Sequence, residues 1–427
     1  MKRSLLFLAT LIVFYSCSPT QQIRRSAERG LLQSEPLQTA HVGISIFDPA
    51  TNKYLYNYQG DKYFVPASNT KIPTAYAAMK YLGDSLVGLR YTTTGNSILI
   101  EPSGDPSFLH SDFKVHPAYQ LLQQYETITI QKPVFEDEFI GSGWSWNDFK
   151  EAYMAQRSNF PIYGNTVRLS WNGAKQVQVA PSYFASSLEV SEPLTNGFSI
   201  EKPWEENRFI ALEGNTKNAE VPFRPTIATI RALLTDTLKR KVELNIFSTK
   251  RPANILYSQP TDSLLKPLMH RSDNFFAEQA LLMAGNEYLG VMSDNKIIDT
   301  LLKTYFKDLP QKPRWVDGSG LSRYNLFTPQ DFVAILNKLK NEFGMERIHT
   351  IFPTGNEGTL TNYYKELTGK LYAKTGTLSG VVALSGYMYT KKNKLLLFSV
   401  LVNNHQNTAT NVRRAVEQFL TGVQAKF

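Results

Sequence analysis

The stretch Pro66-Ala67-Ser68-Asn69-Thr70-Lys71 places a serine and a lysine three residues apart, directly before the helix-like run from Ile72 to Met79. Residues three apart on a helix share one face, with Cβ atoms about 5–6 Å apart. We therefore expect the amine of Lys71 to reach the hydroxyl of Ser68. Because Ser68 would lie at the N-terminal end of this helix, the helix dipole favours a negative charge that develops there.

Two further short patterns follow in chain order, Ser272-Asp273-Asn274 and Lys374-Thr375-Gly376-Thr377. The first supplies a hydroxyl that can relay a proton, and the second supplies an amine and two hydroxyls that can hold a carboxylate. A serine becomes a nucleophile only when a neighbouring group takes its proton. Together with Ser68 and Lys71, the two patterns predict an acylatable serine, its proton-transfer partners and a carboxylate-binding strand.

The first two patterns each occur twice in this sequence, so neither is decisive alone. In Ser263-Leu264-Leu265-Lys266, the following Pro267 predicts a surface turn, because proline cannot continue a helix. The second copy of the other pattern, Ser293-Asp294-Asn295, precedes an apolar run, and we interpret Ser293 as a helix N-cap. The copy that begins at Ser272 leads directly into a helical run, so we select it.

The N-terminus carries an export pattern. Two basic residues precede an apolar run from Leu5 to Tyr15 that is too short to span a bilayer, which predicts a signal peptide over residues 1–16. Cys17, the single cysteine, stands at the end of this run, where bacterial lipoproteins are cleaved and acylated, and we expect it to carry a lipid. Residues 17–36 would then form an N-terminal tether.

Composition excludes several classes of protein. The formal net charge is +9, and about +7 remains without the two basic residues of the signal peptide, a mild field that suits anionic polymers or substrate carboxylates. The sequence has no basic run with interleaved aromatic residues, which is the pattern that would indicate nucleic-acid binding. The six histidines show no metal-ligand spacing, so we expect no metal and no cofactor. The missing Gly-x-Ser-x-Gly elbow argues against an α/β-hydrolase.

Strand-like patterns occur at both ends of the chain. Residues 41–47 alternate and connect through a turn to residues 54–58, which predicts a hairpin. Near the C-terminus, three strands are predicted at 370–375, 381–389 and 394–403, followed by an amphipathic helix at 407–423. Chain ends that build one sheet imply a single domain that is interrupted in the middle.

We therefore divide the chain into a main domain, residues 37–82 and 246–427, and an inserted module, residues 83–245. The inserted part has short strand-like runs, Gly-Asp and Asn-Gly turns, and the tryptophan-rich stretch Trp144-Ser145-Trp146. This pattern predicts a mostly β module.

Taken in order, the three patterns resemble those of the penicillin-recognising serine enzymes. The closer likeness is to the D-alanyl-D-alanine carboxypeptidase/endopeptidase family of low-molecular-mass penicillin-binding proteins, which carry a large insert after the serine helix. It runs from about Val42 to Phe419. Four stretches outside the three patterns support it: Gly104-Asp105-Pro106-Ser107-Phe108, Tyr163-Gly164-Asn165-Thr166-Val167, Asn274-Phe275-Phe276-Ala277-Glu278-Gln279 and Asp317-Gly318-Ser319-Gly320-Leu321-Ser322-Arg323.

The resemblance implies an α+β fold in which the main domain is a β-lactamase/transpeptidase-like catalytic domain: an antiparallel sheet flanked by helices, with a helical subdomain, interrupted by the inserted module. It also implies a periplasmic or cell-envelope enzyme, attached to the membrane only through Cys17. Its partners would be the stem peptides of peptidoglycan, with β-lactam antibiotics as covalent inhibitors, and no nucleic acid.

In that case Ser68 attacks the carbonyl between two D-alanines and forms an acyl-enzyme, which water then hydrolyses. Lys71 is the expected base, provided that burial and the nearby Lys374 lower its pKa from about 10.4 towards 7–8. Ser272 would relay the proton to the leaving amine, and Lys374 would favour that transfer.

The resemblance also implies which groups contact the substrate. The backbone N–H groups of Ser68 and Thr377 would stabilise the tetrahedral oxyanion. The strand Lys374-Thr375-Gly376-Thr377 would hold the terminal carboxylate of the substrate, and Asn274 would bind the backbone of the donor peptide. We interpret the residues from Asp317 to Gly320 first as a turn and keep them off the catalytic set.

Two alternatives remain beside a DD-peptidase. A class A β-lactamase is suggested by Glu192-Pro193-Leu194-Thr195-Asn196, which resembles the loop that carries the deacylating glutamate of that class. Order argues against it, because Glu192 precedes Ser272 by 80 residues instead of following it. The other alternative is an envelope protein that kept the fold and lost turnover. The sequence does not decide between carboxypeptidase and endopeptidase activity.

Overall fold

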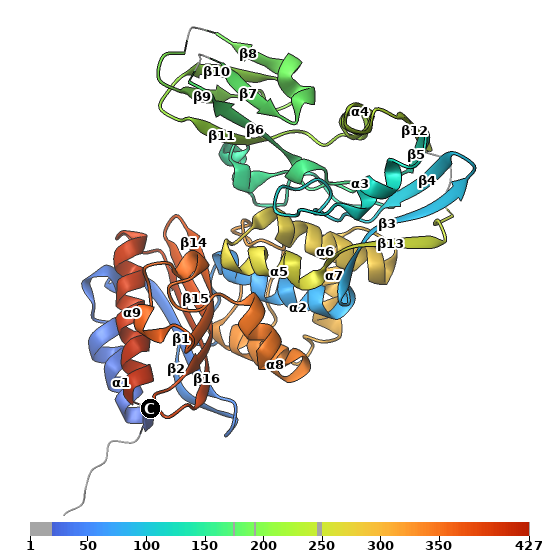
Figure 1. Cartoon of the computed structure of the whole chain (residues 1–427). Coiled ribbons are helices and arrows are strands. Elements are labelled where there is room, and N and C mark those ends of the chain that lie inside the picture. The colour runs from blue at the N-terminus through green and yellow to red at the C-terminus, as the bar shows by residue number, and fades with distance from the viewer. Residues whose placement is uncertain (1–18, 174–175, 192–193, 246–249, 427) are drawn as a thin grey trace, which may run out of the picture.

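The structure is a computed structural model that describes residues 19–173, 176–191, 194–245 and 250–426 (Figure 1). The predicted lipid site, Cys17, and the glutamate of the β-lactamase-like stretch, Glu192, lie outside these residues.

One five-stranded antiparallel sheet unites the two ends of the chain. Its strands are β1 (His41–Asp48), β2 (Lys53–Tyr58), β14 (Leu371–Leu378), β15 (Val381–Tyr389) and β16 (Leu395–Asn403), in the order β14-β15-β16-β1-β2. Strand β1 from the N-terminal part pairs with β16 from the C-terminal part, Ile44 opposite Val400. The prediction that the chain ends build one sheet is confirmed.

Helices cover both faces of this sheet (Figure 1). Helices α1 (Pro19–Ser26) and α9 (Ala409–Lys426) lie on one face, and α2 (Lys71–Tyr81) and α8 (Pro329–Ile351) lie on the other. Alternation along β16 serves both layers, since Leu397 and Leu401 join the core beneath α2 and α8, while Phe398 and Val400 join the core beneath α9.

The N-terminal segment is packed rather than extended. Helix α1 continues into a π-helical turn, Ala27–Leu31, and a 3₁₀ turn, Glu35–Leu37. Ile23, Ala27 and Leu31 are buried in the core beneath α9. From Pro19 onward, the expected tether is therefore part of the main domain, because its apolar side chains cover the outer face of the sheet.

A helical subdomain stands beside the sheet and consists of α2 and α8 with α5 (Thr261–His270), α6 (Asn274–Leu289) and α7 (Asp294–Lys303). The turn predicted at Ser263 is wrong, since this residue lies in α5 and Pro267 is accommodated inside the helix. Burial of Leu264 and Leu268 holds this helix despite the proline. Ser293 caps α7 as predicted, its side chain accepting a hydrogen bond from the Lys296 N–H.

The inserted module is mostly β, as predicted, and has its own core. A five-stranded sheet has the order β12-β5-β4-β3-β13, from β3 (Ser85–Thr94), β4 (Ser97–Pro102), β5 (Thr127–Gln131), β12 (Lys241–Asn245) and β13 (Asn254–Pro260). Two three-stranded sheets comprise β6 (Thr166–Trp171), β7 (Val177–Ala180) and β11 (Asn218–Pro222), and β8 (Leu188–Val190), β9 (Phe198–Glu201) and β10 (Phe209–Glu213). Helices α3 (Pro117–Leu122) and α4 (Ile227–Leu238) complete it. Because β13 pairs with β3, we propose that the module extends to about residue 260.

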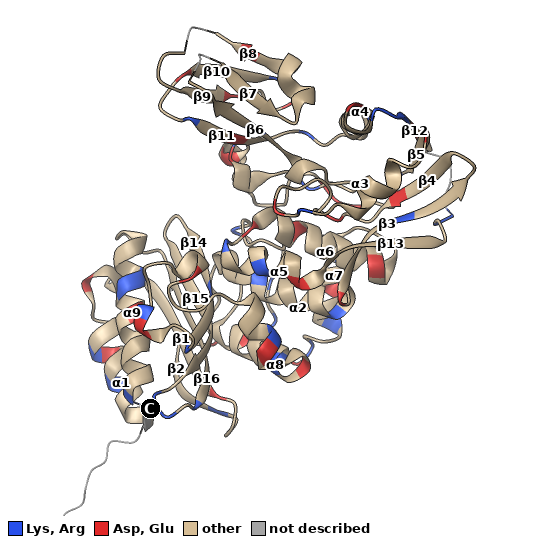
Figure 2. Ribbon diagram, viewed as in Figure 1, with Lys and Arg blue, Asp and Glu red and all other residues tan. Residues whose placement is uncertain are grey.

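Charged residues of both signs are interspersed over the main domain and the inserted module (Figure 2). Within the described ranges, none of the helices has the length and apolar character that a membrane span needs. The same part of the chain contains no group of three side chains suited to hold a metal ion.

Candidate active site

The predicted serine lies in a tight turn between the sheet and the helical subdomain. Ser68 belongs to a 3₁₀ turn, Ala67–Thr70, that leads into α2. The fully buried Lys71 is the first residue of that helix, and its Nζ lies 3.1 Å from Ser68 Oγ. The spacing of the sequence pattern is therefore realised as a direct hydrogen bond.

Two further acceptors hold the amine of Lys71. Its Nζ donates to Asn274 Oδ1 at 2.6 Å and to the carbonyl of Ser319 at 2.7 Å. Burial lowers the pKa of Lys71 to about 8, against the opposing effect of Asp317, Glu278 and Asp273. A lysine with such a pKa can accept a proton near neutral pH.

The second pattern forms the loop between α5 and α6. Ser272 has a left-handed backbone with φ 62°, and Asp273 caps α6 by accepting a hydrogen bond from the Phe276 N–H at 2.9 Å. The amide nitrogen of Asn274 donates to the carbonyl of Tyr153 at 3.0 Å. Asn274 thus contacts Lys71 through its amide oxygen and the inserted module through its amide nitrogen.

The third pattern lies on β14, an edge strand of the sheet. Lys374 is buried, and its Nζ donates to the carbonyl of Thr375 at 2.8 Å. Burial, and then the positive charges of Lys71 and Arg413, hold the pKa of Lys374 well below its usual range. Thr375 donates its hydroxyl proton to Thr359 at 2.7 Å.

These elements surround one cavity of about 800 Å³. Its lining includes Ser68, Ser272, Asn274 and Thr377, together with residues of the inserted module such as Tyr153. The structure therefore brings the first two patterns and the end of the third to one cleft. Asp148 and Arg323 place charges of opposite sign on its wall.

The model of the D-Ala-D-Ala carboxypeptidase 3 (S13) family matches residues 25–423. The chain belongs to this family. It is accordingly a serine-type D-Ala-D-Ala peptidase, as the resemblance of the three patterns indicated.

Several relatives of this S13 peptidase cover most of its length. It is 25% identical to a D-alanyl-D-alanine carboxypeptidase of Actinomadura sp. over 89% of this chain and 80% of the relative. It is 24% identical to the D-alanyl-D-alanine carboxypeptidase DacB of Haemophilus influenzae over 86% of each chain.

Solved structures show the same fold. Penicillin binding protein 4 (dacB) of Haemophilus influenzae matches with a TM-score of 0.75 and 20% identity, over 94% of this chain and 99% of the other. A predatory peptidoglycan endopeptidase of Bdellovibrio bacteriovorus matches with a TM-score of 0.55 and 15% identity, over 90% and 92% of the two chains.

Sequence reasoning missed the loop that completes the site of this S13 peptidase. The segment from Asp317 to Gly320, interpreted as a turn, supplies the Ser319 carbonyl to Lys71. The Asp317 carboxylate shapes the loop by accepting from the N–H groups of Gly320 and Ser322. Gly320 has φ 83°, and a Cβ there would lie 1.9 Å from the carbonyl of Ala67, so only glycine fits beside the serine turn.

Two charged residues near the cleft were also not predicted from the sequence. Glu278 is fully buried in α6, and a charge within an otherwise apolar helical run was the signal that could have drawn attention to it. Arg413 of α9 donates to Thr377 Oγ1 at 2.5 Å, and no local sequence pattern connects these two residues.

A second cavity, of about 380 Å³, lies on the inserted-module side of the α5–α6 loop. It shares Tyr153, Ser272 and Asn274 with the cavity that contains Ser68. Its remaining lining is rich in charged and polar groups, namely His110, Asp112, Arg168, Glu220, Arg271 and Asp273. The cleft therefore continues from the serine into a polar chamber between the two parts of the chain.

Proposed function

We propose that Ser68 is the nucleophile of this DD-peptidase and that Lys71, Ser272 and Lys374 move its protons. The observation that carries the proposal is the 3.1 Å contact between Lys71 Nζ and Ser68 Oγ in the cleft, with the pKa of Lys71 lowered to about 8 mainly by burial. A neutral amine at that distance is placed to act as a general base.

The reaction is acylation followed by hydrolysis. Ser68 Oγ attacks the carbonyl carbon of the penultimate D-alanine while its proton passes to Lys71. When the tetrahedral intermediate collapses, the C–N bond breaks; Ser272 gives its proton to the leaving amine and receives in turn the proton held by Lys71, which returns to the neutral amine, with Lys374 favouring the transfer. An ester links Ser68 to the remaining peptide, and water then hydrolyses it.

The oxyanion of the intermediate would be held by the backbone N–H groups of Ser68 and Thr377. The close approach of β14 to the serine turn supports this assignment, since a Cβ on Gly376 would lie 3.0 Å from the Ser68 nitrogen. Loss of one such donor costs about 2.7–4 kcal/mol of transition-state stabilisation in other serine hydrolases.

Substrate selection falls to β14 and Asn274. Thr375, Gly376 and Thr377 would hold the terminal carboxylate, and the positive charge of Arg413 beside this strand favours an anion. Asn274 would bind the donor peptide backbone. This reading makes a free D-alanine carboxylate the recognised feature of the substrate.

Cleavage of D-alanyl cross-links is the second candidate activity, and the polar chamber behind Ser272 is the observation that favours it. A cross-linked substrate carries two stem peptides with several carboxylates and amines. The chamber offers both charge signs, with Arg168 and Arg271 against Glu220 and Asp112. We propose that it receives a part of the substrate distant from the scissile bond.

We further propose a periplasmic location with a lipid anchor at Cys17 after removal of a signal peptide over residues 1–16, in line with an enzyme that acts on the cell wall. β-Lactams would acylate Ser68 as substrate mimics. The Haemophilus influenzae penicillin binding protein 4, whose fold this chain shares, was solved in complex with a β-lactam.

The direct test is labelling with a fluorescent penicillin, followed by release of D-alanine from a pentapeptide. The native protein should form a covalent band and release D-alanine, and Ser68→Ala should do neither. An unlabelled native protein, or a labelled Ser68→Ala variant, would refute the assignment. Rapid release of hydrolysed drug from the native protein would favour the β-lactamase alternative, and labelling without any peptide turnover would favour the non-catalytic one.

A further inference from the structure

Two arginine–glutamate pairs connect the inserted module to helix α6. Arg90 of β3 forms a bidentate pair with Glu287, with N–O distances of 2.9 and 2.6 Å. Arg157, in a loop of the module, places NH1 3.5 Å from Glu278 Oε2. The two glutamates lie on the same helix, yet only Glu278 also contacts the loop that holds Lys71.

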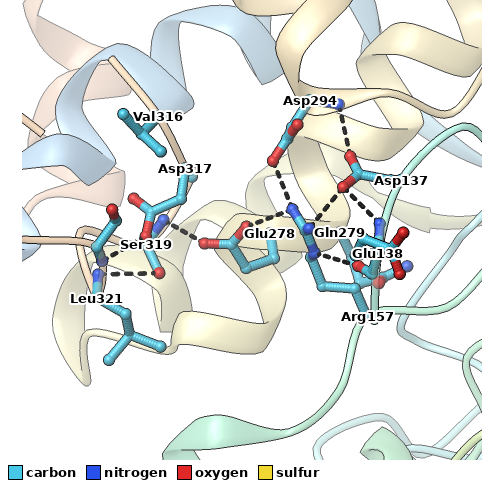
Figure 3. Close-up of polar contacts among 12 residues, drawn as sticks. Asp137, Glu138, Arg157, Glu278, Gln279, Asp294, Val316, Asp317, Ser319 and Leu321 are labelled. Carbon is cyan, nitrogen blue, oxygen red and sulfur yellow. Dashed lines mark hydrogen bonds and ion pairs between the residues drawn. The ribbon is translucent and has the colours of Figure 1, made fainter. Parts of the chain in front are cut away.

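Arg157 is the centre of a buried ionic cluster (Figure 3). Its NH1 lies 2.5 Å from Asp294 Oδ2, its NH2 lies 2.5 Å from Asp137 Oδ1, and its Nε donates to the carbonyl of Glu138 at 3.0 Å. The guanidinium is thus fixed by four partners from both parts of the chain. Buried arginines of this kind hold their surroundings in one geometry because each lost partner leaves an unpaired charge.

Glu278 transmits this geometry to the site through a single residue. Its Oε1 accepts a hydrogen bond from the Ser319 N–H at 2.7 Å, and the Ser319 carbonyl accepts one from Lys71 Nζ, also at 2.7 Å. In Figure 3, Glu278 lies between the Arg157 cluster on one side and Ser319 on the other. The loop packs closely against α6, because a Cβ on Gly318 would lie 2.5 Å from the carbonyl of Ala277 in that helix.

A second contact from the inserted module reaches the same loop. Trp144 Nε1 donates to Asp317 Oδ2 at 2.9 Å, and the guanidinium of Arg157 lies 5.8 Å from the centre of the Trp144 ring. The module therefore supports both ends of the segment from Asp317 to Ser319.

We propose that Glu278 and Arg157 are positioning residues for Lys71: through Ser319 they fix the carbonyl that holds the lysine amine beside Ser68, so that the inserted module takes part in acylation. This inference rests on the proposed role of Lys71 as the base. It assigns the module a task inside the active site in addition to lining the cleft.

The pH dependence of acylation distinguishes an electrostatic effect of Glu278 on Lys71 from an effect of packing alone. The charged groups that face Lys71 are Asp273 before α6, Glu278 within α6, Asp317 in the loop and Lys374 on β14. Burial and then the neighbouring Asp317 raise the pKa of Glu278, while the charge of Arg157 favours its ionised form. An ionised Glu278 favours the protonated form of Lys71.

Glu278→Gln keeps an oxygen for the Ser319 N–H and removes the charge. The pKa of Lys71 should then fall, and neutral lysine should be available at lower pH. The rate constant of acylation by a fluorescent penicillin, measured against pH, should show its rising limb displaced to lower pH. Glu278→Ala also removes the acceptor, and acylation should fall on the order of tenfold or more at every pH, because the lysine is no longer held in place.

Helix α6 offers matched controls in Glu287→Gln and Glu287→Ala. These variants break an equivalent arginine pair to the same module without touching Ser319, and they should keep the native pH profile. A Glu278→Gln profile that superimposes on the native one, or a Glu287→Gln profile displaced equally, would overturn the proposal.

Thermal unfolding of each variant separates positioning from loss of fold. If Glu278→Ala does not fold, Glu278→Gln and Arg157→Lys decide. The lysine retains the charge but cannot reach all four partners, so at a temperature where both variants are folded acylation should fall in Arg157→Lys and stay native in Arg90→Lys. An unlabelled native protein would refute the proposed function itself, whereas a labelled native protein with an undisplaced Glu278→Gln profile would refute this inference alone.

Discussion

Gly376 of β14 lies so close to Ser68 that a Cβ placed on it would sit 3.0 Å from the Ser68 backbone nitrogen and 2.7 Å from the carbonyl of Pro66. Both neighbours are backbone atoms, so no side-chain rotation relieves the contact. The glycine is required here by space and not by its backbone angles. Its absent side chain lets the strand approach the serine turn as closely as the proposed oxyanion site requires.

Gly376→Ala should therefore displace β14 from the serine turn and lower the acylation rate on the order of 10²-fold, as expected when catalytic groups shift by about 1 Å. The measurement is the rate constant of penicillin labelling. Gly422→Ala on helix α9 is the control, because a Cβ on Gly422 would meet only the Oγ of Ser26, at an ordinary contact distance of 3.6 Å. Equal rates for both variants would remove the steric argument.

The acylation rate should rise with pH as Lys71 loses its proton. Burial lowers the pKa of Lys71 to about 8, so the base form is scarce well below that pH and dominant above it. Lys71→Ala should lower the rate by about 10²–10⁴-fold and remove this limb of the profile. A native profile whose only rising limb lies near pH 4, where ordinary carboxyl groups titrate, would point to a different base.

Local patterns predicted much of this architecture. The strands near residues 41–58 and 370–403 were visible because alternation with period two is encoded within each strand, and the Ser68 to Lys71 contact follows from the pitch of a single turn. The turn predicted at Ser263 failed because the tolerance of Pro267 inside α5 depends on burial of leucines against other helices. That information is not local.

Contacts between residues far apart in the sequence also explain which parts of the candidate site could not be predicted. Arg157 and Glu278 are separated by 121 positions, and the Lys71 contact to Ser319 spans 248. Arginine and glutamate are not unusual residue types. Only the folded chain shows that Arg157 and Glu278 are connected through Ser319 to the lysine beside Ser68. The motif from Asp317 was noticed, yet its carbonyl group, the part that contacts Lys71, is a backbone atom that residue patterns do not reveal.

Arg413 should help to recognise the free carboxylate of the substrate. Its guanidinium donates to Thr377 Oγ1 at the end of the predicted carboxylate-binding strand. Arg413→Ala should lower kcat/KM for a peptide that ends in a free D-alanine carboxylate on the order of tenfold, the size expected for a charge-assisted hydrogen bond. The same peptide with an amidated end should be affected far less.

The adjacent Arg414 gives the control for that experiment. It pairs with Glu417 at 2.6 Å and stacks on Tyr363, and its hydrogen bonds go to Asn362 and Glu417 instead of Thr377. Arg414→Ala should keep the native preference for the free acid. If both variants lose this preference equally, the effect belongs to the charge of α9 and not to Arg413.

The N-terminal segment should contribute to the stability of the main domain. Ile23 is fully buried beneath α9, and Ile23→Ala should lower the free energy of unfolding by about 2–5 kcal/mol, the range for truncation of a buried aliphatic side chain. Arg29→Ala, at an exposed position of the same segment, should change it by less than about 0.5 kcal/mol. Urea unfolding followed by tryptophan fluorescence would measure both. Equal stability of Ile23→Ala and the native protein would return this segment to the role of a tether.

A substitution in the polar chamber behind Ser272 should distinguish carboxypeptidase activity from cleavage of cross-links. Arg168 of β6 lies opposite Glu220 of β11 in register, and both side chains line the chamber. Arg168→Ala should lower kcat/KM for cleavage of a cross-linked muropeptide dimer on the order of tenfold, by removal of a cation that can hold a stem-peptide carboxylate. Penicillin labelling and release of D-alanine from a short peptide should stay at native rates, because these ligands do not extend past the α5–α6 loop.

Arg208→Ala is the matched variant, since Arg208 is an exposed arginine of the same module that pairs with Glu189 and does not line the chamber. It should leave all three activities unchanged. Equal loss of dimer cleavage in both variants would indicate a general effect of the module's charge. Native dimer cleavage in Arg168→Ala would remove the assigned role of the chamber, and dimer cleavage would then have to depend on contacts within the serine cavity alone.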